Sequence, residues 1–328
     1  MIARPAFTVD QDRLSLDHEN PWPIEGEPME TEHGAFPPDT PFLSGGVDLF
    51  VMGSAYAPNG NPTGEVRVDV RAGSRFSRSI RVVGDRVWRA VGGDGKKTPL
   101  VLEASPPAPF VSMPLSYERA FGGTTNAEGY DYSYPPNPAG RGLYATAEAA
   151  LEQPLPNLED YEHPIRSIDD RPEPVGTAPY PADGSLRPLS ALELHVDHVN
   201  SENTRIERIT PRFFNAAHPS MVIPPEHAPA PGELIEVTSV RPGGAPFRFG
   251  LPDMAMHAHV QLEDRQYLFP LHLDQIGMLP DENRVFLSFR TVFTYRMVPH
   301  ERRRTTLHRG HAPNSIPESY AARWEDAS

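Results

Sequence analysis

The sequence predicts a mainly β protein in which two β-rich halves, antiparallel and sandwich-like, are joined by a long proline-rich irregular middle region with few short helices. Two observations support this prediction. The 39 prolines and 25 glycines make up about a fifth of the 328 residues, and both residue types interrupt helices and central strands. Apolar and polar residues alternate with the two-residue period of a strand on either side of residues 105–190, but show little periodicity within them.

This pattern divides the chain into five segments. Length alone leaves open whether they form one large domain or two. The segments are an acidic, proline-rich N-terminal arm (1–46), the first β-rich half (47–112), a proline-rich signature region of the same domain (113–190), the second β-rich half (191–298), and a basic tail with a short C-terminal helix (299–328).

Six strand runs are expected in the arm and the first half: 7–9, 14–16, 47–52, 65–71, 79–83 and 86–91. The first two runs predict a hairpin within the arm. The turn-rich stretch 58–64 predicts that the next two runs pair antiparallel, because Pro, Asn and Gly favour tight turns. The last two runs are expected to continue this pair as a β-meander.

Strands of the second half are expected at 191–198, 233–240, 256–262, 265–269 and 285–298. The last run predicts one continuous strand of 14 residues. Short helices are expected at 145–152 and near the C-terminus, where residues 315–318 fit a capping box and Ile316, Tyr320 and Trp324 repeat every four residues.

Composition excludes several classes of function. The formal net charge is −14, so neither nucleic acid nor an anionic membrane is an expected partner, and partners with basic patches are favoured. The chain has no cysteine, which removes disulfides, thiol nucleophiles and zinc–thiolate sites. No run approaches the roughly 20 apolar residues of a membrane-spanning helix. We expect a cytoplasmic protein.

The search for catalytic and metal-binding chemistry gives no strong candidate. His257 and His259 share one strand face, but that face continues with polar residues and is expected to be exposed, whereas His195 and His198 fall on opposite faces of a strand. Phosphate-binding glycine loops and nucleophile elbows do not occur. We therefore expect no metal, no cofactor and no enzymatic activity.

The least generic stretch is residues 113–123, which places Tyr117, Arg119 and Phe121 on one face if it is extended and ends in Gly122 and Gly123. Its ordinary interpretation is a strand that ends at a glycine turn. Three further motifs follow in order at residues 137–142, 155–159 and 213–217. We call these four stretches the signature segments.

The signature segments resemble a bacterial family known as domain of unknown function 2169, over about residues 48–297. Members of that family are similar to accessory proteins of type VI secretion. The resemblance implies a non-enzymatic adaptor or chaperone in the bacterial cytoplasm that binds a secreted effector and helps to load it onto spike proteins of the VgrG and PAAR types. The sequence departs from the family pattern at residues 172–188. Family members carry tryptophan there, whereas this chain has Tyr180 and no tryptophan. The oligomeric state stays open.

Carried over to this sequence, the family pattern selects 13 residues as partner-binding or structural. Glycines are expected to shape the backbone, the two phenylalanines after residue 212 to fill core, and the charged residues and Asn157 to form one polar network with an ion pair from Glu118 to Arg119 or Arg141. The residues are Tyr117, Glu118, Arg119, Phe121, Gly122, Gly123, Asn137, Gly140, Arg141, Asn157, Phe213, Phe214 and Asn215.

Two other functions remain open from the sequence. One is a β-sandwich hydrolase or carbohydrate-active enzyme, for which Glu118, Asp160 and His195 are the candidate catalytic groups. The other is a structural subunit of the secretion apparatus. A buried, pKa-shifted carboxylate pair in a cleft favours the enzyme, and an exposed apolar patch rimmed by polar groups favours the adaptor.

Overall fold

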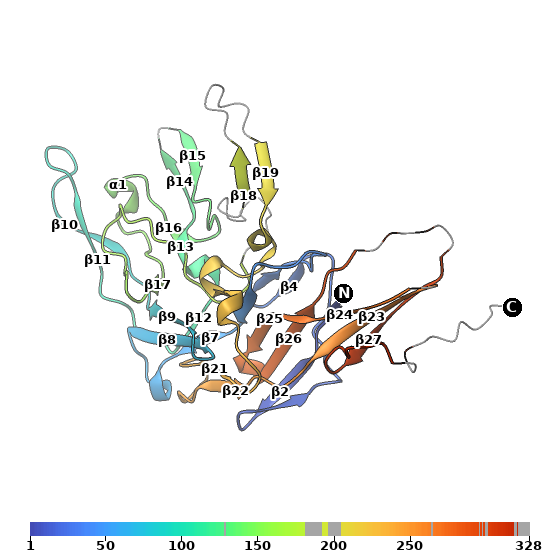
Figure 1. Ribbon diagram of the computed structural model, residues 1–328. Helices are drawn as coiled ribbons and strands as arrows, with labels where there is room; N and C mark the ends of the chain where they lie inside the picture. Colours follow the sequence, from blue (N-terminus) through green and yellow to red (C-terminus); the bar gives the residue numbers. More distant parts are fainter. Residues whose placement is uncertain are drawn as a thin grey trace.

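The protein is mainly β, as predicted, in a computed structural model that describes residues 1–127, 129–180, 192–195, 205–263, 265–294, 296, 298, 301–317 and 320 (Figure 1). Within these residues the only α-helix is α1 (Ala147–Ala150), which falls inside the predicted helical run. The side chain of Thr146 caps this helix by accepting a hydrogen bond from the Ala149 backbone.

A seven-stranded sheet forms the centre of the molecule. Its strands, in spatial order, are β20 (Val222–Ile223), β6 (Val47–Val51), β25 (His272–Leu279), β26 (Arg284–Arg290), β2 (Ala6–Asp10) and β3 (Arg13–Leu16), with β1 (Ile2–Ala3) also pairing with β26. Strand β6 runs parallel to β25, with Leu49 opposite Ile276, and the other pairs are antiparallel. The predicted N-terminal hairpin is β2–β3, and it lies in this sheet.

A five-stranded sheet packs against the central sheet. Its order is β17 (Leu158–Asp160), β9 (Phe76–Val83), β8 (Glu65–Ala72), β21 (Leu234–Val237) and β22 (Phe247–Gly250). Alternate residues of β8 are buried, so Val66, Val68 and Val70 face the core. They share one continuous apolar core with residues of the central sheet such as Leu49 and Phe286, which makes the body a β-sandwich.

Smaller sheets surround the sandwich. The two-stranded sheets are β4 (Met29–Thr31) with β5 (Gly34–Phe36), β7 (Ser54–Tyr56) with β12 (Ser112–Pro114), β10 (Trp88–Gly92) with β11 (Val101–Ala104), β13 (Phe121–Gly122) with β16 (Arg141–Gly142), β14 (Thr124–Ala127) with β15 (Tyr130–Ser133), and β18 (Leu192–His195) with β19 (Arg205–Ile209). In Figure 1 the hairpins β10–β11, β14–β15 and β18–β19 project towards the top of the view.

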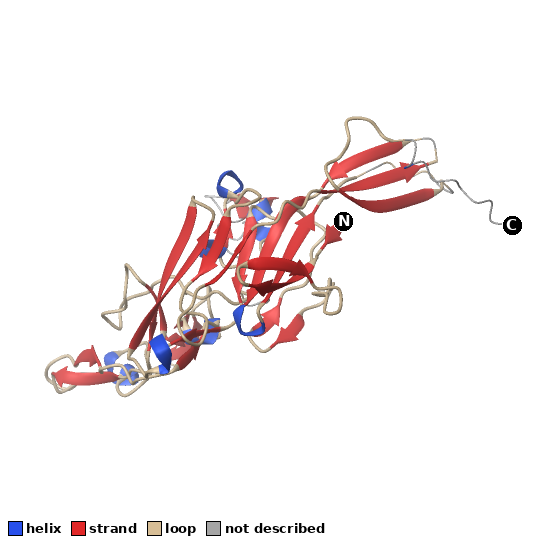
Figure 2. Ribbon diagram, turned by 90° about the horizontal axis from the view of Figure 1, so that it is seen from below, coloured by secondary structure: helices blue, strands red, loops and turns tan. Residues whose placement is uncertain are grey.

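A three-stranded sheet extends from one end of the body, near the C-terminus (Figure 2). It consists of β24 (Gln266–Pro270), β23 (Met256–Leu262) and β27 (Arg303–Arg309), with β23 in the middle. The remaining short elements are the 3-10 helices η1 (Pro58–Gly60), η2 (Tyr117–Arg119), η6 (Pro211–Phe214), η7 (Pro219–Met221), η8 (Pro225–His227) and η9 (Pro280–Glu282).

The proline-rich middle region, over its described part, is ordered by a second apolar core. Trp88 and Phe121 meet Leu143, Leu155 and Ile165 there. Trp88, the first residue of β10, packs in this cluster. The predicted meander is wrong at this point, because β10 pairs with β11 instead of β9.

Three further predictions of strand arrangement are wrong. Strands β6 and β8 do not pair; all five residues of β6 are buried because it lies inside the central sheet. Within the run 285–298, strand β26 ends at Arg290, because Arg290 pairs with His272, the first residue of β25, and no strand among the described residues pairs with the chain beyond it. The stretch around Tyr117 is a 3-10 turn, so Tyr117, Arg119 and Phe121 do not share a strand face.

Two other expectations concern the C-terminal part. His257 and His259 do share one face, but this face is buried, with 1% and 2% of the two residues exposed, because His308 and Tyr320 stack over it. The predicted C-terminal helix rests on residues 318, 319 and 321–328, which lie outside the described residues.

Candidate functional site

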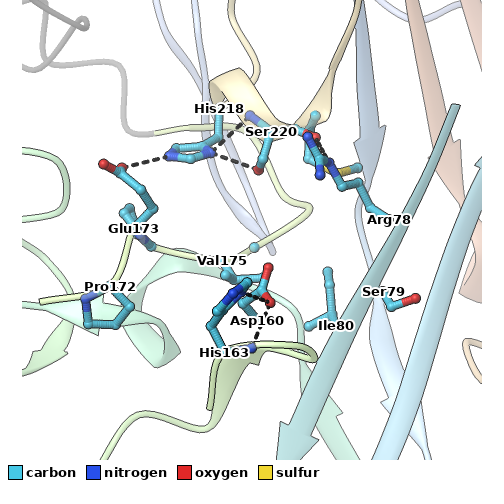
Figure 3. Close-up of a pocket in the computed structure, with 13 residues that line it drawn as sticks. Arg78, Ser79, Ile80, Asp160, His163, Pro172, Glu173, Val175, His218 and Ser220 are labelled. Atoms are coloured by element: carbon cyan, nitrogen blue, oxygen red, sulfur yellow. Dashed lines mark hydrogen bonds and ion pairs between the residues drawn. The ribbon is translucent and has the colours of Figure 1, made fainter. Parts of the chain in front are cut away.

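A pocket of about 320 Å³ opens beside strand β9 (Figure 3). Four stretches form its walls: β9 itself, the turn after β17, the loop 172–176, and the loop 218–221, which includes η7. Ile80, Val175 and Met221 give it an apolar lining, and its polar lining residues include Arg78, Asp160, Glu173, His218 and Ser220. An apolar cavity with a few convergent polar groups is the usual form of a ligand site.

His218 and Ser220 form a hydrogen-bonded pair in the wall of the pocket. The Nδ1 atom of His218 lies 2.8 Å from the Ser220 hydroxyl and also accepts the Ser220 backbone N–H at 3.3 Å. These bonds make His218 the N-cap of η7 and leave its Nε2 as the protonated nitrogen. The Nε2 atom points towards the Glu173 carboxylate, 3.9 Å away.

The His218 ring is neutral at physiological pH. Burial, and then the positive charge of Arg78, together lower its pKa to about 4. Arg78 is held in place by a hydrogen bond of 2.9 Å from its Nε to the carbonyl oxygen of Ser220. Ser220 is therefore bonded through its hydroxyl to a neutral imidazole and through its carbonyl oxygen to a guanidinium.

The opposite rim of the pocket is acidic. The Asp160 carboxylate accepts hydrogen bonds from the backbone and the imidazole of His163, and the His163 side chain is 85% exposed. The Glu173 side chain is 77% exposed. The Asp160 carboxylate at the end of β17 and the Glu173 carboxylate in the loop 172–176 both face solvent, so they are not a buried pair.

The first signature segment supports the pocket from behind. Tyr117 is 3% exposed, and its hydroxyl donates a hydrogen bond of 3.1 Å to the carbonyl of Gly176, the last residue of the wall 172–176. Its ring contacts Tyr180 edge to face and lies 5.9 Å from the His218 ring. A side chain at Gly176 has no room, because the Tyr117 ring lies only 3.0 Å from where a Cβ would be.

Asn157 joins three signature segments. It is fully buried, its Oδ1 accepts hydrogen bonds from Arg119 at 3.1 Å and Arg141 at 3.3 Å, and its Nδ2 donates to the Val83 carbonyl and to Asp85. The sequence-predicted polar network of these two arginines and Asn157 is thus present. Burial, and then the nearby charge of Arg119, lower the pKa of Arg141 from its usual value.

Glu118 takes part in this network only through its backbone. Its carbonyl oxygen accepts a hydrogen bond of 2.9 Å from Arg141 Nε, while its exposed side chain forms no ion pair with Arg119 or Arg141 in the described part of the chain. The expected ion pair is therefore wrong. The 3-10 turn η2 explains the difference, because it directs the Glu118 side chain outward and its carbonyl inward.

Asn137 and the signature glycines fix the local backbone. The Asn137 amide donates to the carbonyls of Tyr117 and Phe121, and its own carbonyl accepts the N–H of Gly123. Gly122 has a φ of 149° and a Cβ there would collide with the Asn137 carbonyl oxygen; Gly140 packs against the Asn137 amide in the same way. The glycines therefore shape the backbone, as the family pattern implied.

Asn215 attaches the fourth signature segment to the central sheet. Its Nδ2 donates to Asp48 at 2.8 Å, its Oδ1 accepts from Gly45 N at 2.9 Å, and the next backbone N–H, that of Ala216, donates to Asp48 at 2.8 Å. Burial, and then the charge of Asp274, together raise the pKa of Asp48 to about 7. This attachment places the following loop, which carries His218, at the pocket.

Phe213 and Phe214 do not fill the core, contrary to expectation. Both are half-buried, and Phe214 stacks on Phe42 with ring centroids 4.4 Å apart. Phe42 is 51% exposed and its neighbour Leu43 is 45% exposed. We call Phe42, Leu43, Phe213 and Phe214 the aromatic patch.

Several residues of the site were missed from the sequence. His218 and Ser220 stand in a His-Pro-Ser sequence typical of a helix start, a signal that predicts a cap rather than a pocket. Glu159, inside the third signature segment, is 2% exposed and pairs with Arg86 at 2.5 Å and Arg81 at 2.8 Å. Nothing in the sequence indicates these partners.

Other candidate chemistry is limited. Among the described residues, no three histidine, aspartate or glutamate side chains converge as ligands for a metal ion. No helix in the described part of the chain is long and apolar enough to cross a membrane. Of the candidate catalytic groups, Glu118 is exposed away from the pocket lining, Asp160 lines the pocket, and His195 lies in β18, whose side chains are outside the described structure.

Fold and site together define a β-sandwich protein in which three signature segments meet at Asn157 and the fourth supplies two phenylalanines of an aromatic patch. A family model matches residues 1–290, most of the chain, and is described as "Uncharacterized protein conserved in bacteria (DUF2169)". The chain belongs to this family. No curated protein and no solved structure matches this chain.

Proposed function

We propose that the protein is a non-enzymatic adaptor or chaperone that binds a secreted effector of type VI secretion and helps to load it onto the spike complex. The observation that carries this proposal is the aromatic patch. Two signature phenylalanines that hydrophobicity alone would bury completely are only half-buried and extend an exposed surface formed by Phe42 and Leu43. Exposed apolar groups that gather in one place are characteristic of protein-binding surfaces.

The polar surroundings of the aromatic patch support the same function. Arg212 beside it is exposed, and Thr40 is half-buried. Both flanking backbones are fixed: Asn215 bonds to Asp48, and the Thr40 and Phe42 carbonyls accept hydrogen bonds from Arg290. A rigid apolar centre with a polar rim loses little conformational entropy when a partner binds.

Hairpin β14–β15 offers a second exposed aromatic surface. Tyr130 and Tyr132 are two residues apart in β15, so they share a face, and they are 70% and 53% exposed. Tyrosine is among the residues that contribute most to protein interfaces. The hairpin projects from the body (Figure 1) and is accessible to a large partner.

The test is co-expression with the candidate effector encoded beside the gene, followed by size-exclusion chromatography with light scattering. A stoichiometric complex is expected, and Phe42→Ser combined with Leu43→Ser should weaken it at least about tenfold, because the centre of an interface carries most of its binding energy. Ile24→Ser is the matched control, since Ile24 is 48% exposed but is not among the patch residues. Separate elution of a folded effector would contradict the proposal.

A second function, serine hydrolysis, is favoured by one observation: the Ser220 hydroxyl lies 2.8 Å from His218 Nδ1, and Glu173 lies 3.9 Å from the other ring nitrogen. The order serine, histidine and carboxylate is that of a nucleophilic triad. Two features weaken it: Nδ1 already accepts the Ser220 backbone N–H, and a pKa of about 4 makes His218 a weak base. Labelling by a fluorophosphonate probe, lost in Ser220→Ala, would support hydrolysis and count against a purely binding role.

A further inference from the structure

Strand β27 is the longest strand at a free sheet edge in the described part of the chain. It has seven residues, against five in β24, four in β3 and β22, and three or two in β17 and β20. It pairs with β23 along one side over all seven residues, and no described strand pairs with its other side. At about 3.3 Å per residue, its outer side offers roughly 23 Å of backbone hydrogen-bonding groups.

The side chains on this edge are basic in an acidic protein. Arg303, Arg304 and Arg309 lie in β27 and Arg302 directly precedes it; all four are exposed, and none forms an ion pair within the described residues. The chain as a whole carries a formal charge of −14. This edge is therefore a local positive site that a negatively charged partner would find.

The strand also offers an apolar contact between its charges. Arg303, Leu307 and Arg309 lie on one face, since they are separated by even numbers of residues, and Leu307 is 45% exposed. On the same face of the sheet, Tyr267 of β24 is 38% exposed and lies opposite Val260 of β23. A strand added beside β27 would place its alternate side chains next to Arg303, Leu307 and Arg309, whereas Tyr267 lies on the far side of β23.

Two other occupants of this edge fit less well. A second copy of β27 would bring arginines opposite arginines, and directly opposed like charges destabilise strand pairs. Nucleic acid would be attracted by the positive edge but repelled by the net negative charge of the protein. The charges thus select against both occupants.

We propose that β27 binds an extended, acidic segment of a partner protein, which adds to the three-stranded sheet as a fourth strand. Backbone hydrogen bonds along the free edge provide the attachment, and the four arginines select acidic side chains. This inference does not depend on the proposed adaptor function or on the identity of an effector. Strand β27 lies after residue 290, beyond the part of the chain that matches the family, so the interaction belongs to this chain's own C-terminal part.

The probe is a fluorescein-labelled peptide with alternating glutamate and valine, about as long as the seven residues of β27. Fluorescence anisotropy with the full-length protein should show binding that weakens in high salt, because surface charge attraction is screened. The same peptide with lysine in place of glutamate should not bind. A copy N-methylated at alternate residues should bind poorly, because it lacks backbone donors along one edge.

Arg303→Glu combined with Arg309→Glu should weaken the glutamate peptide at least about tenfold, since both attractive charges become repulsive. Arg13→Glu combined with Arg89→Glu is the matched control: both arginines are exposed on strands of other sheets. Equal binding of the two peptides, or of the N-methylated copy, would overturn the proposal, as would tighter binding of a single-stranded oligonucleotide. So would loss of binding in the control alone.

Discussion

Replacement of Asn157 by alanine is the most direct test of the polar network behind the pocket. Asn157 is fully buried and uses both ends of its amide: Oδ1 accepts from Arg119 and Arg141, and Nδ2 donates to the Val83 carbonyl and to Asp85. Alanine removes all four hydrogen bonds at once. The site contains no other described side chain that takes their place.

The loss of stability is worked out from the surroundings of each partner. The Val83 carbonyl belongs to a fully buried residue, and a buried acceptor without a partner costs about 1–3 kcal/mol. The other three partners are partly or fully exposed, so water replaces some of each bond, and each contributes about 0.5–1 kcal/mol. We expect Asn157→Ala to lower the free energy of unfolding by roughly 4 kcal/mol, within the range for a broken buried network.

Urea denaturation followed by the fluorescence of the buried Trp88 measures this change. Asn157→Asp separates donors from acceptors: it strengthens the bonds from both arginines but turns an acceptor towards the Val83 carbonyl and Asp85. It should therefore also destabilise the protein at neutral pH, and less so when the new carboxyl is protonated. Asn126→Ala, on an exposed hairpin, should stay within about 0.5 kcal/mol of the parent. A loss below about 1 kcal/mol for Asn157→Ala would refute the reasoning.

Three further predictions concern pH and backbone geometry. Burial and the charge of Asp274 raise the pKa of Asp48 to about 7, so the stability that its protonated form provides is fully present below about pH 4 and is lost as pH rises to 7. Asp48→Asn should therefore reduce the change of the urea midpoint with pH over this range. An unchanged pH dependence would contradict the assignment. The pKa of His218, lowered to about 4 by burial, has the opposite effect: stability worth up to roughly 3 kcal/mol is present above pH 6.5 and is lost as pH falls towards 4. His218→Gln should make this loss of stability at acid pH smaller, as measured by thermal unfolding between pH 4 and 7. A variant that loses stability as steeply as the parent would contradict the prediction. Gly122→Ala should cost at least about 2 kcal/mol more than Gly232→Ala in thermal or urea unfolding, because both glycines have positive φ but only the first lacks room for a Cβ; equal losses would count against the clash.

Much of the strand content was predictable, but strand pairing was not. The predicted runs correctly indicated the strands β8, β9 and β23; alternate residues are buried in β8, whereas all seven residues of β23 are buried. Alternation says nothing about partners. The parallel pairing of β6 with β25 joins residues more than two hundred positions apart, and no local pattern specifies that choice.

The candidate site shows the same division. The network of Arg119, Arg141 and Asn157 was predictable from the resemblance to a family, and the structure brings these side chains together. The position of Phe213, which is only half-buried, was not predictable, because hydrophobicity describes how strongly a side chain favours burial and not where the fold places it. The pocket combines His218 with Glu173 from a separate loop, and such convergence is a property of the folded chain alone.

The central sheet also determines when this protein is able to fold during synthesis. Arg4 bonds to Ser288, 284 positions later, and the Met1 amino group bonds to the Thr291 carbonyl. At roughly 5–20 residues per second, a ribosome needs about 15–60 s to add the intervening residues. Throughout that time β1 lacks its partner β26, and β2 is paired on one side at most, with the adjacent β3. The N-terminal strands therefore complete their native pairing only after nearly the whole chain has been synthesised.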